Sequence, residues 1–429
     1  MAETYQLYDF MHYPNMAFKM SAIQPFTWSG ALTKEQRHSH HHQHQHPQCC
    51  TAKWFLTKVW FIFGATNLIY QTFGMFIYLL APQSAHMYTA ANMEPEYQIA
   101  LVAQISETGG IMGLTLVAAC KMFIMFWHGK RIAKLLEELQ EIFPREHVQH
   151  EPNALYRVQY FAKTSGNLMK RTTIFFIFAF CFYNSLPILE IMYEHFSADQ
   201  HIMYRYQSNT WYPWQTKENS KTWWNFTFAY LCQLQSSLTG VSFIMAGEFM
   251  LCFFITQMQM HFDYLGNALM SLNAASAQAN EELKILIVYH IKLLRFSKEI
   301  NIIFNISFLV NFITSSVAIC LMAFSMVMIS MSHTFKYSVG LLSFLVFNFF
   351  ICYNGSEFTT SSDELMPSAF YNNWYDGDIC YRRMILFFMM RSCESNVLRA
   401  YKFATVSMPT FMAILKLSYQ LFTFVRAVG

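Results

Sequence analysis

The chain has 429 residues, of which 54% are hydrophobic and only 13% are charged, and it contains 43 Phe, 28 Met and 24 Tyr. Soluble domains average about 25% charged residues, so this composition excludes an ordinary soluble protein and indicates a membrane protein. The formal net charge of +3 is too small to suggest a protein that binds nucleic acid.

Residues 1–53 form a polar leader that lacks the continuous apolar core of a secretory signal peptide, so we expect the N-terminus to stay in the cytosol. Within this leader, residues 38–46 read HSHHHQHQH. Histidines can bind metal ions, but the tract contains no Cys or carboxylate that would complete a site. We interpret the tract as disordered, and we expect neither a metal nor a cofactor.

Hydropathy predicts an all-α membrane protein with seven transmembrane helices. Several of the predicted spans exceed the roughly 20 residues that cross a bilayer, which indicates tilt or extension beyond the membrane. The predicted spans are Trp54–Leu80, Gln98–Trp127, Thr172–Tyr193, Trp223–Gln257, Ile302–Met331, Tyr337–Tyr353 and Thr405–Ala427.

The distribution of Lys and Arg predicts the orientation of these spans. With the N-terminus in the cytosol, the cytosolic segments contain 21 basic residues and the external loops contain 4. Seven spans then place the C-terminus outside the cell, which is opposite to a G-protein-coupled receptor. All ten cysteines lie in spans or cytosolic segments, so we expect reduced thiols and no external disulfide.

Three cytosolic stretches, 130–142, 281–303 and 384–390, are predicted to be helical and are too short or too charged to span a membrane. They form either a helical bundle below the membrane or separate amphipathic helices on the inner leaflet. The predicted organisation is a cytosolic leader at 1–53, six transmembrane helices with their cytosolic extensions at 54–357, a cytosolic anchor segment at 358–404, and a final helix at 405–429.

Six ionisable side chains fall within or near the spans, and such residues are candidates for a functional role. We expect Lys58, Lys121 and Glu190 to lie near span ends, where they reach the membrane surface. The deeper Glu107 and Glu248 are scattered along the chain, so we expect a structural role rather than a catalytic pair. Because the sequence also lacks G-x-S-x-G, HExxH and CxxC motifs, we do not expect an enzyme. The sixth ionisable residue is Lys416.

Small and polar residues recur every three or four positions in the last span and therefore share one helical face. Lipid would leave such groups without hydrogen-bond partners, so this face meets either other helices or water. One interpretation is a helix packed inside the bundle, and the other is a helix that lines a pore. The stripe consists of Thr410, Ala413, Lys416, Gln420, Thr423 and Ala427.

Short motifs in the last 50 residues resemble, in combination, the C-terminus of insect odorant receptors, and specifically of the odorant-selective, or tuning, subunits. The seven-span layout with a cytosolic N-terminus agrees with this resemblance over the whole chain. The motifs are Arg382-Arg383-Met384-Ile385, Met389-Met390-Arg391-Ser392, Lys402-Phe403, Thr410-Phe411, Ile414-Leu415-Lys416, Ser418-Tyr419 and Phe422-Thr423.

The resemblance implies a ligand-gated, non-selective cation channel in the plasma membrane of olfactory sensory neurons. A tuning subunit of this family joins a co-receptor subunit in a tetramer, and the last helices line one central pore. The permeating ions would be Na⁺ and K⁺, with Ca²⁺ as a further candidate. The implied pore residues are Lys416, Gln420, Thr423 and Phe424, with a hydrophobic gate around the last two.

The ligand would be a small volatile organic molecule, whose site should be concave, lined by aromatic residues and sparsely polar. The outer halves of the second to sixth spans supply such residues at similar depth, and a Tyr or Gln would bind one polar group of the ligand. The alternative is that these residues are ordinary bundle core. The candidates are Ile105, Thr108, Met112, Phe182, Tyr183, Leu186, Pro187, Phe226, Tyr230, Gln233, Leu234, Phe324 and Phe344.

Two other functions remain open. A gustatory-type receptor channel would share the topology, but its usual Thr-Tyr-x-x-x-x-x-Gln-Phe signature is absent. A transporter is disfavoured by the odd number of spans and by the lack of internal symmetry.

Overall fold

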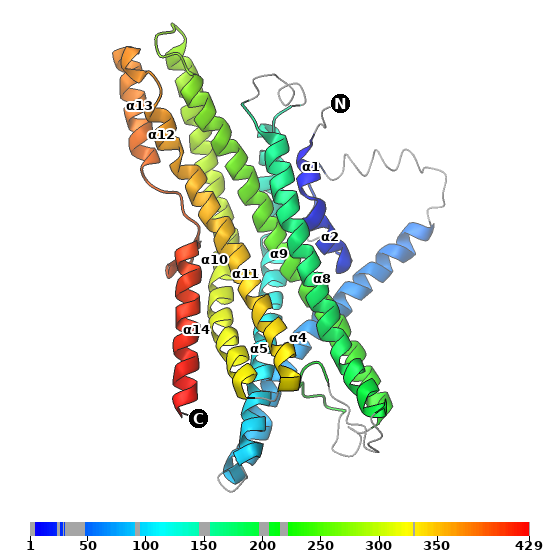
Figure 1. Cartoon of the computed structure of the whole chain (residues 1–429). Coiled ribbons are helices and arrows are strands. Elements are labelled where there is room, and N and C mark those ends of the chain that lie inside the picture. Colours follow the sequence, from blue (N-terminus) through cyan, green and yellow to red (C-terminus); the bar gives the residue numbers. More distant parts are fainter. Residues whose placement is uncertain are drawn as a thin grey trace.

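The computed structural model describes residues 5–23, 26–28, 30, 48–90, 95–145, 155–196, 206–214, 222–328 and 331–428. Within this part of the chain, seven helices of more than 20 residues form an elongated bundle (Figure 1). Each predicted span falls mainly in one of them, although Ile302–Met331 runs past the end of α10 at Met328, and this confirms the all-α, seven-helix prediction. They are α4 (Gln48–Ala90), α5 (Pro95–Trp127), α8 (Val158–Phe196), α9 (Trp223–Ser271), α10 (Ala279–Met328), α11 (Met331–Asp363) and α14 (Met408–Val428).

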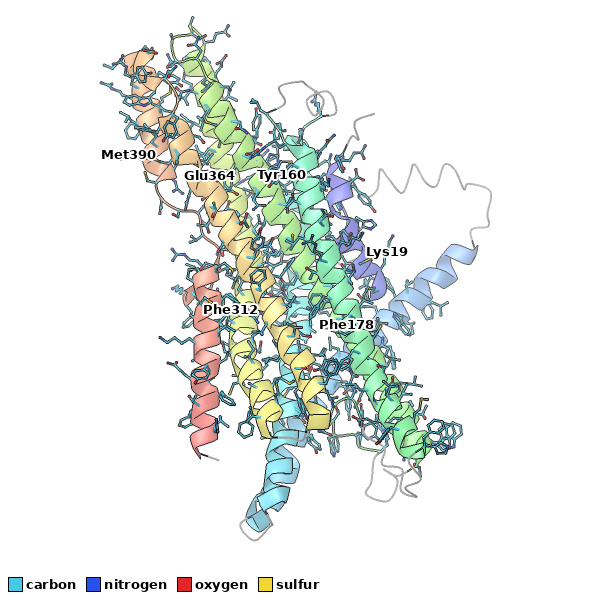
Figure 2. All side chains as sticks on the ribbon, viewed as in Figure 1. Lys19, Tyr160, Phe178, Phe312, Glu364 and Met390 are labelled. Carbon is cyan, nitrogen blue, oxygen red and sulfur yellow. The ribbon has the colours of Figure 1, made fainter. Side chains whose placement is uncertain are left out.

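Six of these helices, all except α4, are long and apolar enough over their described residues to cross a membrane. The apolar stretch of α9 is almost entirely buried, as expected of a helix that is hydrophobic on every side and lies at the centre of a bundle. The apolar stretches of α8 and α14 are mostly exposed, so these two helices lie at the periphery. Phe178 on α8, for example, is 53% exposed, which suits a surface that faces lipid (Figure 2).

The bundle is much longer than a membrane is thick. The 49 residues of α9 and the 50 of α10 extend for about 75 Å at 1.5 Å per residue, against a hydrocarbon core of about 30 Å. At one end, which we call the anchor end, these helices lie beside α12 (Leu365–Phe370) and α13 (Ile379–Ser392). At the other, the loop end, α14 reaches its C-terminus (Figure 1), and residues 206–214, which come between α8 and α9 in the chain, contact α4, α5 and α9.

The three stretches that were predicted to be cytosolic helices are all helical. The stretch 130–142 is α6 (Gly129–Ile142), and its leucine face is buried as the amphipathic pattern predicts. The stretch 281–303 continues without a break into the fifth span as part of α10, and 384–390 lies within α13. Ion pairs from Arg295 to Glu138 and from Lys292 to Glu141 connect α10 to α6.

Polar contacts attach α13 to the anchor end of α9. Asp378 caps α13 by accepting a hydrogen bond from the backbone N–H of Tyr381 (2.7 Å), and this bond, helped by the Asn280 amide, lowers the pKa of the Asp378 carboxyl. The Tyr381 hydroxyl donates to Asn372, whose amide donates to the backbone oxygens of Leu269 and Leu272 at the end of α9.

The last helix begins at Met408 rather than at the predicted Thr405. Residues Arg399–Ala400 (β1) and Ala404–Thr405 (β2) pair as a short antiparallel hairpin that precedes it. Val406, which follows the hairpin, lies against α11: a Cβ on Gly355 would lie 2.2 Å from its backbone oxygen, so position 355 requires glycine. The hairpin and Val406 therefore set where α14 begins along α10 and α11.

Part of the N-terminal leader is folded, which the sequence did not predict. The helices α1 (Leu7–Phe10) and α2 (His12–Met20) pack on the bundle, mainly against α9. The Ser242 hydroxyl donates to Ser21 (2.8 Å), and the ring of Tyr13 meets that of Phe249 edge-on. The predicted disordered histidine tract at 38–46 lies outside the described residues.

The orientation of the bundle remains a prediction with a direct test. An epitope added after Gly429 is expected to be stained on intact cells, whereas an epitope added before Met1 is expected to require permeabilisation, because the basic residues concentrate at the anchor end. Staining of the N-terminal epitope on intact cells would contradict the predicted topology.

Candidate functional site

A cavity lies among six helices of the bundle, α4, α5, α8, α9, α10 and α11. Its volume is about 130 Å³, close to the roughly 150 Å³ of an engineered apolar cavity that holds a benzene molecule. The wall is mainly apolar and aromatic, which is typical of a site for a small organic ligand. The main apolar residues are Leu114, Phe176, Phe180, Val241, Ile244, Met322, Phe344 and Phe347.

Tyr183 and Gly340 form one wall by a close approach of α8 to α11. The Tyr183 hydroxyl donates to the backbone oxygen of Lys336 (2.9 Å), and a Cβ on Gly340 would lie 2.3 Å from that hydroxyl. Any other residue at position 340 would therefore displace Tyr183 and open the contact between the two helices.

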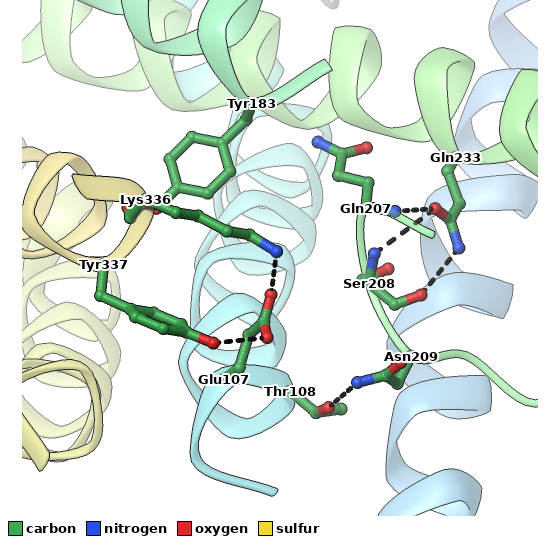
Figure 3. A network of polar contacts seen from close by, with 9 residues as sticks. All are labelled: Glu107, Thr108, Tyr183, Gln207, Ser208, Asn209, Gln233, Lys336 and Tyr337. Carbon is green, nitrogen blue, oxygen red and sulfur yellow. Dashed lines mark hydrogen bonds and ion pairs between the residues drawn. The ribbon is translucent and has the colours of Figure 1, made fainter. Parts of the chain in front are cut away.

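A polar layer, whose contacts Figure 3 shows, adjoins the cavity through Tyr183 and Gln207. Glu107 of α5 forms an ion pair with Lys336 of α11 and also accepts a hydrogen bond from the Tyr337 hydroxyl (3.0 Å). These partners offset the free-energy cost of placing the Glu107 carboxylate at membrane depth.

The segment 206–214, which we call the inserted loop, completes this layer. Gln233 of α9 accepts from the backbone N–H of Gln207 (3.1 Å) and donates to the backbone oxygen of Ser208 (2.9 Å), as Figure 3 shows. The Asn209 amide donates to the hydroxyl of Thr108 on α5 (3.2 Å). The sequence placed this segment in an external loop without predicting that it folds back into the bundle.

Contacts to α4 hold the other half of the inserted loop. Thr210 donates to the side-chain oxygen of Gln71 (2.9 Å), and the backbone N–H of Trp211 donates to the carbonyl of Gly74 (3.1 Å). Tyr212 is buried, and burial raises the pKa of its hydroxyl, which therefore stays neutral. The loop is thus attached to three helices.

A buried ion pair lies on the opposite side of the cavity. Lys121 of α5 pairs with Glu248 of α9, and these side chains are 4% and 1% exposed. The ammonium group also donates to Ser307 (3.2 Å) and lies 5.5 Å from the ring centre of Phe347, which lines the cavity. The prediction that Lys121 reaches a membrane surface is wrong. Glu107 and Glu248, for which a structural role was expected, each form an ion pair with a lysine.

Of the thirteen candidate ligand residues, Tyr183 and Phe344 line the cavity. Thr108 and Gln233 instead hold the inserted loop. Tyr230 donates to the backbone oxygen of Asn184 (2.6 Å), with Phe226 stacked on its ring. Seven others do not line the cavity: Ile105, Met112, Phe182, Leu186, Pro187, Leu234 and Phe324. Ligand contact stays a prediction for the whole set.

The cavity lies deeper than the predicted site by one to two helical turns. On α9 it is lined by Ser236, Ser237 and Gly240 rather than by Phe226 and Tyr230. The inserted loop bonds to the predicted residues Thr108 and Gln233, and the cavity lies on the side of the loop that faces the anchor end. On α9, the small residues Ser236, Ser237 and Gly240 after the predicted positions are a sequence signal that would have indicated this depth.

The last helix packs on α10 and α11 through one face and exposes the other. Ile414 and Ser418 are buried, and Phe411 meets Phe349 edge-on. The predicted pore residues Lys416, Gln420, Thr423 and Phe424 are all exposed. The interpretation that the polar stripe packs inside the bundle of this chain is therefore wrong, and the stripe faces away from it.

The sequence model of the 7tm odorant receptor family matches residues 101–419. The chain belongs to the odorant receptor family. This receptor is 35% identical to the putative odorant receptor 69a, isoform B, of Drosophila melanogaster, over 99% of the chain and 100% of the relative. It is 32% identical to isoform A over the same shares. Membership of the family confirms the resemblance in the C-terminal motifs and agrees with the expectation that the receptor is not an enzyme.

Solved structures show the same fold. The olfactory receptor OR5 from Machilis hrabei matches this receptor with a TM-score of 0.69 at 13% identity, over 99% of both chains. The same protein in complex with eugenol matches with a TM-score of 0.67 at 13% identity, over 98% of this receptor and 100% of that chain. At this identity the likeness establishes the architecture and carries no residue roles.

Proposed function

We propose that this receptor is the odorant-binding subunit of a ligand-gated, non-selective cation channel, and that a small volatile molecule binds in the cavity. The observation that carries the proposal is a mainly apolar, aromatic-lined space of about 130 Å³ in an odorant receptor, large enough for about one ring. The eugenol complex of the Machilis hrabei receptor supports a small organic ligand.

The pore would be shared with other subunits. Lipid around the exposed stripe of α14 would leave Lys416, Gln420 and Thr423 without polar partners, whereas a water-filled pore would solvate them. We propose a tetramer with a co-receptor subunit around one central pore that passes Na⁺, K⁺ and Ca²⁺. Its site of action would be the plasma membrane of olfactory sensory neurons.

Reducing the cavity tests the ligand site. Ser343 lines the cavity on α11, while its neighbour Leu342 is 49% exposed on the outside of the same helix. Because a phenyl group would occupy much of the space, Ser343→Phe is expected to raise the agonist concentration for half-maximal current at least about tenfold when coexpressed with a co-receptor.

Leu342→Phe, which adds similar bulk to the outer surface, is the matched control and is expected to leave the dose–response curve unchanged. Both variants are compared at equal amounts of surface protein. An unchanged curve for Ser343→Phe would remove the cavity from the ligand site.

A further inference from the structure

The side-chain oxygen of Asn184, in the cavity wall, accepts no hydrogen bond from the described residues. Its side chain is 5% exposed and lines the cavity on α8. Its amide nitrogen donates to the backbone oxygen of Phe180 (2.8 Å), and among the described residues its Oδ1 has no hydrogen-bond partner. A carbonyl such as that of Phe180 can only accept, so this contact fixes which end of the amide is the oxygen.

The hydroxyl groups of the cavity have little to donate. A hydroxyl carries one hydrogen, and four of the cavity hydroxyls already use theirs inside the protein. Tyr183 donates to Lys336, and Ser237 donates to the side-chain oxygen of Gln207 (3.0 Å). Thr115 and Ser343 donate to backbone oxygens within their own helices. Ser236 is the one cavity hydroxyl without a recorded bond to another described residue.

We propose that the ligand of this cavity is a small alcohol or phenol whose hydroxyl hydrogen is accepted by Oδ1 of Asn184; this inference rests on the proposed function. A buried acceptor without a donor costs free energy. A ligand that donates a hydrogen bond to it is therefore favoured over a ligand that cannot. A site built to bond a hydroxyl discriminates strongly against the analogue that lacks it. The ring or carbon chain of the same ligand would pack on the surrounding phenylalanines.

Matched pairs of ligands test the inference. We would record dose–response curves from cells that express the receptor with a co-receptor, using 2-phenylethanol, cyclohexanol and benzyl alcohol, each against its methyl ether. The ether keeps the carbon skeleton and the oxygen but loses the hydrogen. The alcohols are expected to reach half-maximal current at concentrations about tenfold lower than the ethers.

The variant Asn184→Leu removes the acceptor with little change in volume. It is expected to abolish the preference for alcohols over ethers. The concentration for half-maximal current should rise about tenfold for the alcohols and should stay the same or fall for the ethers. The matched control is Asn354→Leu on α11, which removes the same type of bond to the backbone oxygen four residues earlier, from Asn354 to Phe350, outside the cavity. That control is expected to keep the preference.

The outcomes separate the inference from the proposed function. Equal potency of alcohols and ethers, as would follow if a water molecule already supplied the hydrogen to Asn184, overturns the inference while the receptor still responds. A preference that survives Asn184→Leu also overturns it. If no volatile evokes current with both subunits at the surface, the proposed function fails and the inference fails with it. Should Asn184→Leu not reach the surface, the ratio of alcohol potency to ether potency in the unmodified receptor still tests the inference.

Discussion

Replacing Lys121 with methionine is expected to remove most of the folded receptor from the cell surface. The substitution leaves the carboxylate of Glu248, which is 1% exposed, without its cation. Breaking a buried ion pair from one side destabilises a protein by about 3–5 kcal/mol, a large part of a total stability of about 5–15 kcal/mol. The measurement is the amount of surface-labelled protein relative to the unmodified receptor.

The double variant Lys121→Met/Glu248→Met is expected to recover much of the lost surface protein, because two apolar side chains of similar volume replace the pair without leaving a charge. As a control, Lys134→Met breaks an ion pair with Glu138 at the surface, where the Lys134 side chain is 76% exposed. Exposed pairs contribute about 0–1 kcal/mol, so the surface amount should stay the same. A double variant as depleted as the single one would show that charge pairing is not the cause.

Cells that express this receptor without a co-receptor are expected to give no odorant-evoked cation current. Under the proposed function, four copies would bring four exposed Lys416 ammonium groups towards the pore axis, about 12 Å from Phe424 at 1.5 Å per residue. A ring of positive charge repels cations, and a mixed tetramer dilutes it. Whole-cell recording with and without the co-receptor measures the difference.

In the mixed channel, Lys416→Gln is expected to change the single-channel conductance or the permeability ratio among cations. Lys402→Gln, at an exposed position in the hairpin before α14, removes the same charge outside the helix and is expected to have no such effect. A robust current from this receptor expressed alone, with Lys416 intact, would contradict the argument.

The seven helices were predictable because the signal is local. A span in lipid must satisfy its own backbone hydrogen bonds, so length and hydropathy alone identify it. The amphipathic pattern of 130–142 is equally local, and α6 follows it. The polar stripe of α14 was predictable as a face, but only the packing of Ile414 and Phe411 on the neighbouring helices shows that it faces away from the bundle.

The ion pairs and the depth of the cavity were not predictable, because they depend on contacts distant in sequence. The ion-paired Lys121 and Glu248 are 127 residues apart, and Glu107 is 230 residues from Tyr337, which donates a hydrogen bond to it. The position of the inserted loop depends on bonds to three helices, which no periodicity encodes. Without that loop, the sequence placed the candidate ligand residues one to two turns nearer the loop end than the cavity lies.

Whole-cell recording from cells that express this receptor with a co-receptor, under a panel of volatile compounds, tests the central claim most directly. We predict an inward current that requires both subunits, reverses near zero potential as for a non-selective cation channel, and loses sensitivity in Ser343→Phe. The same response from the co-receptor alone, or no response to any volatile with both subunits at the surface, would contradict the claim that this receptor binds the odorant in its cavity and opens the channel.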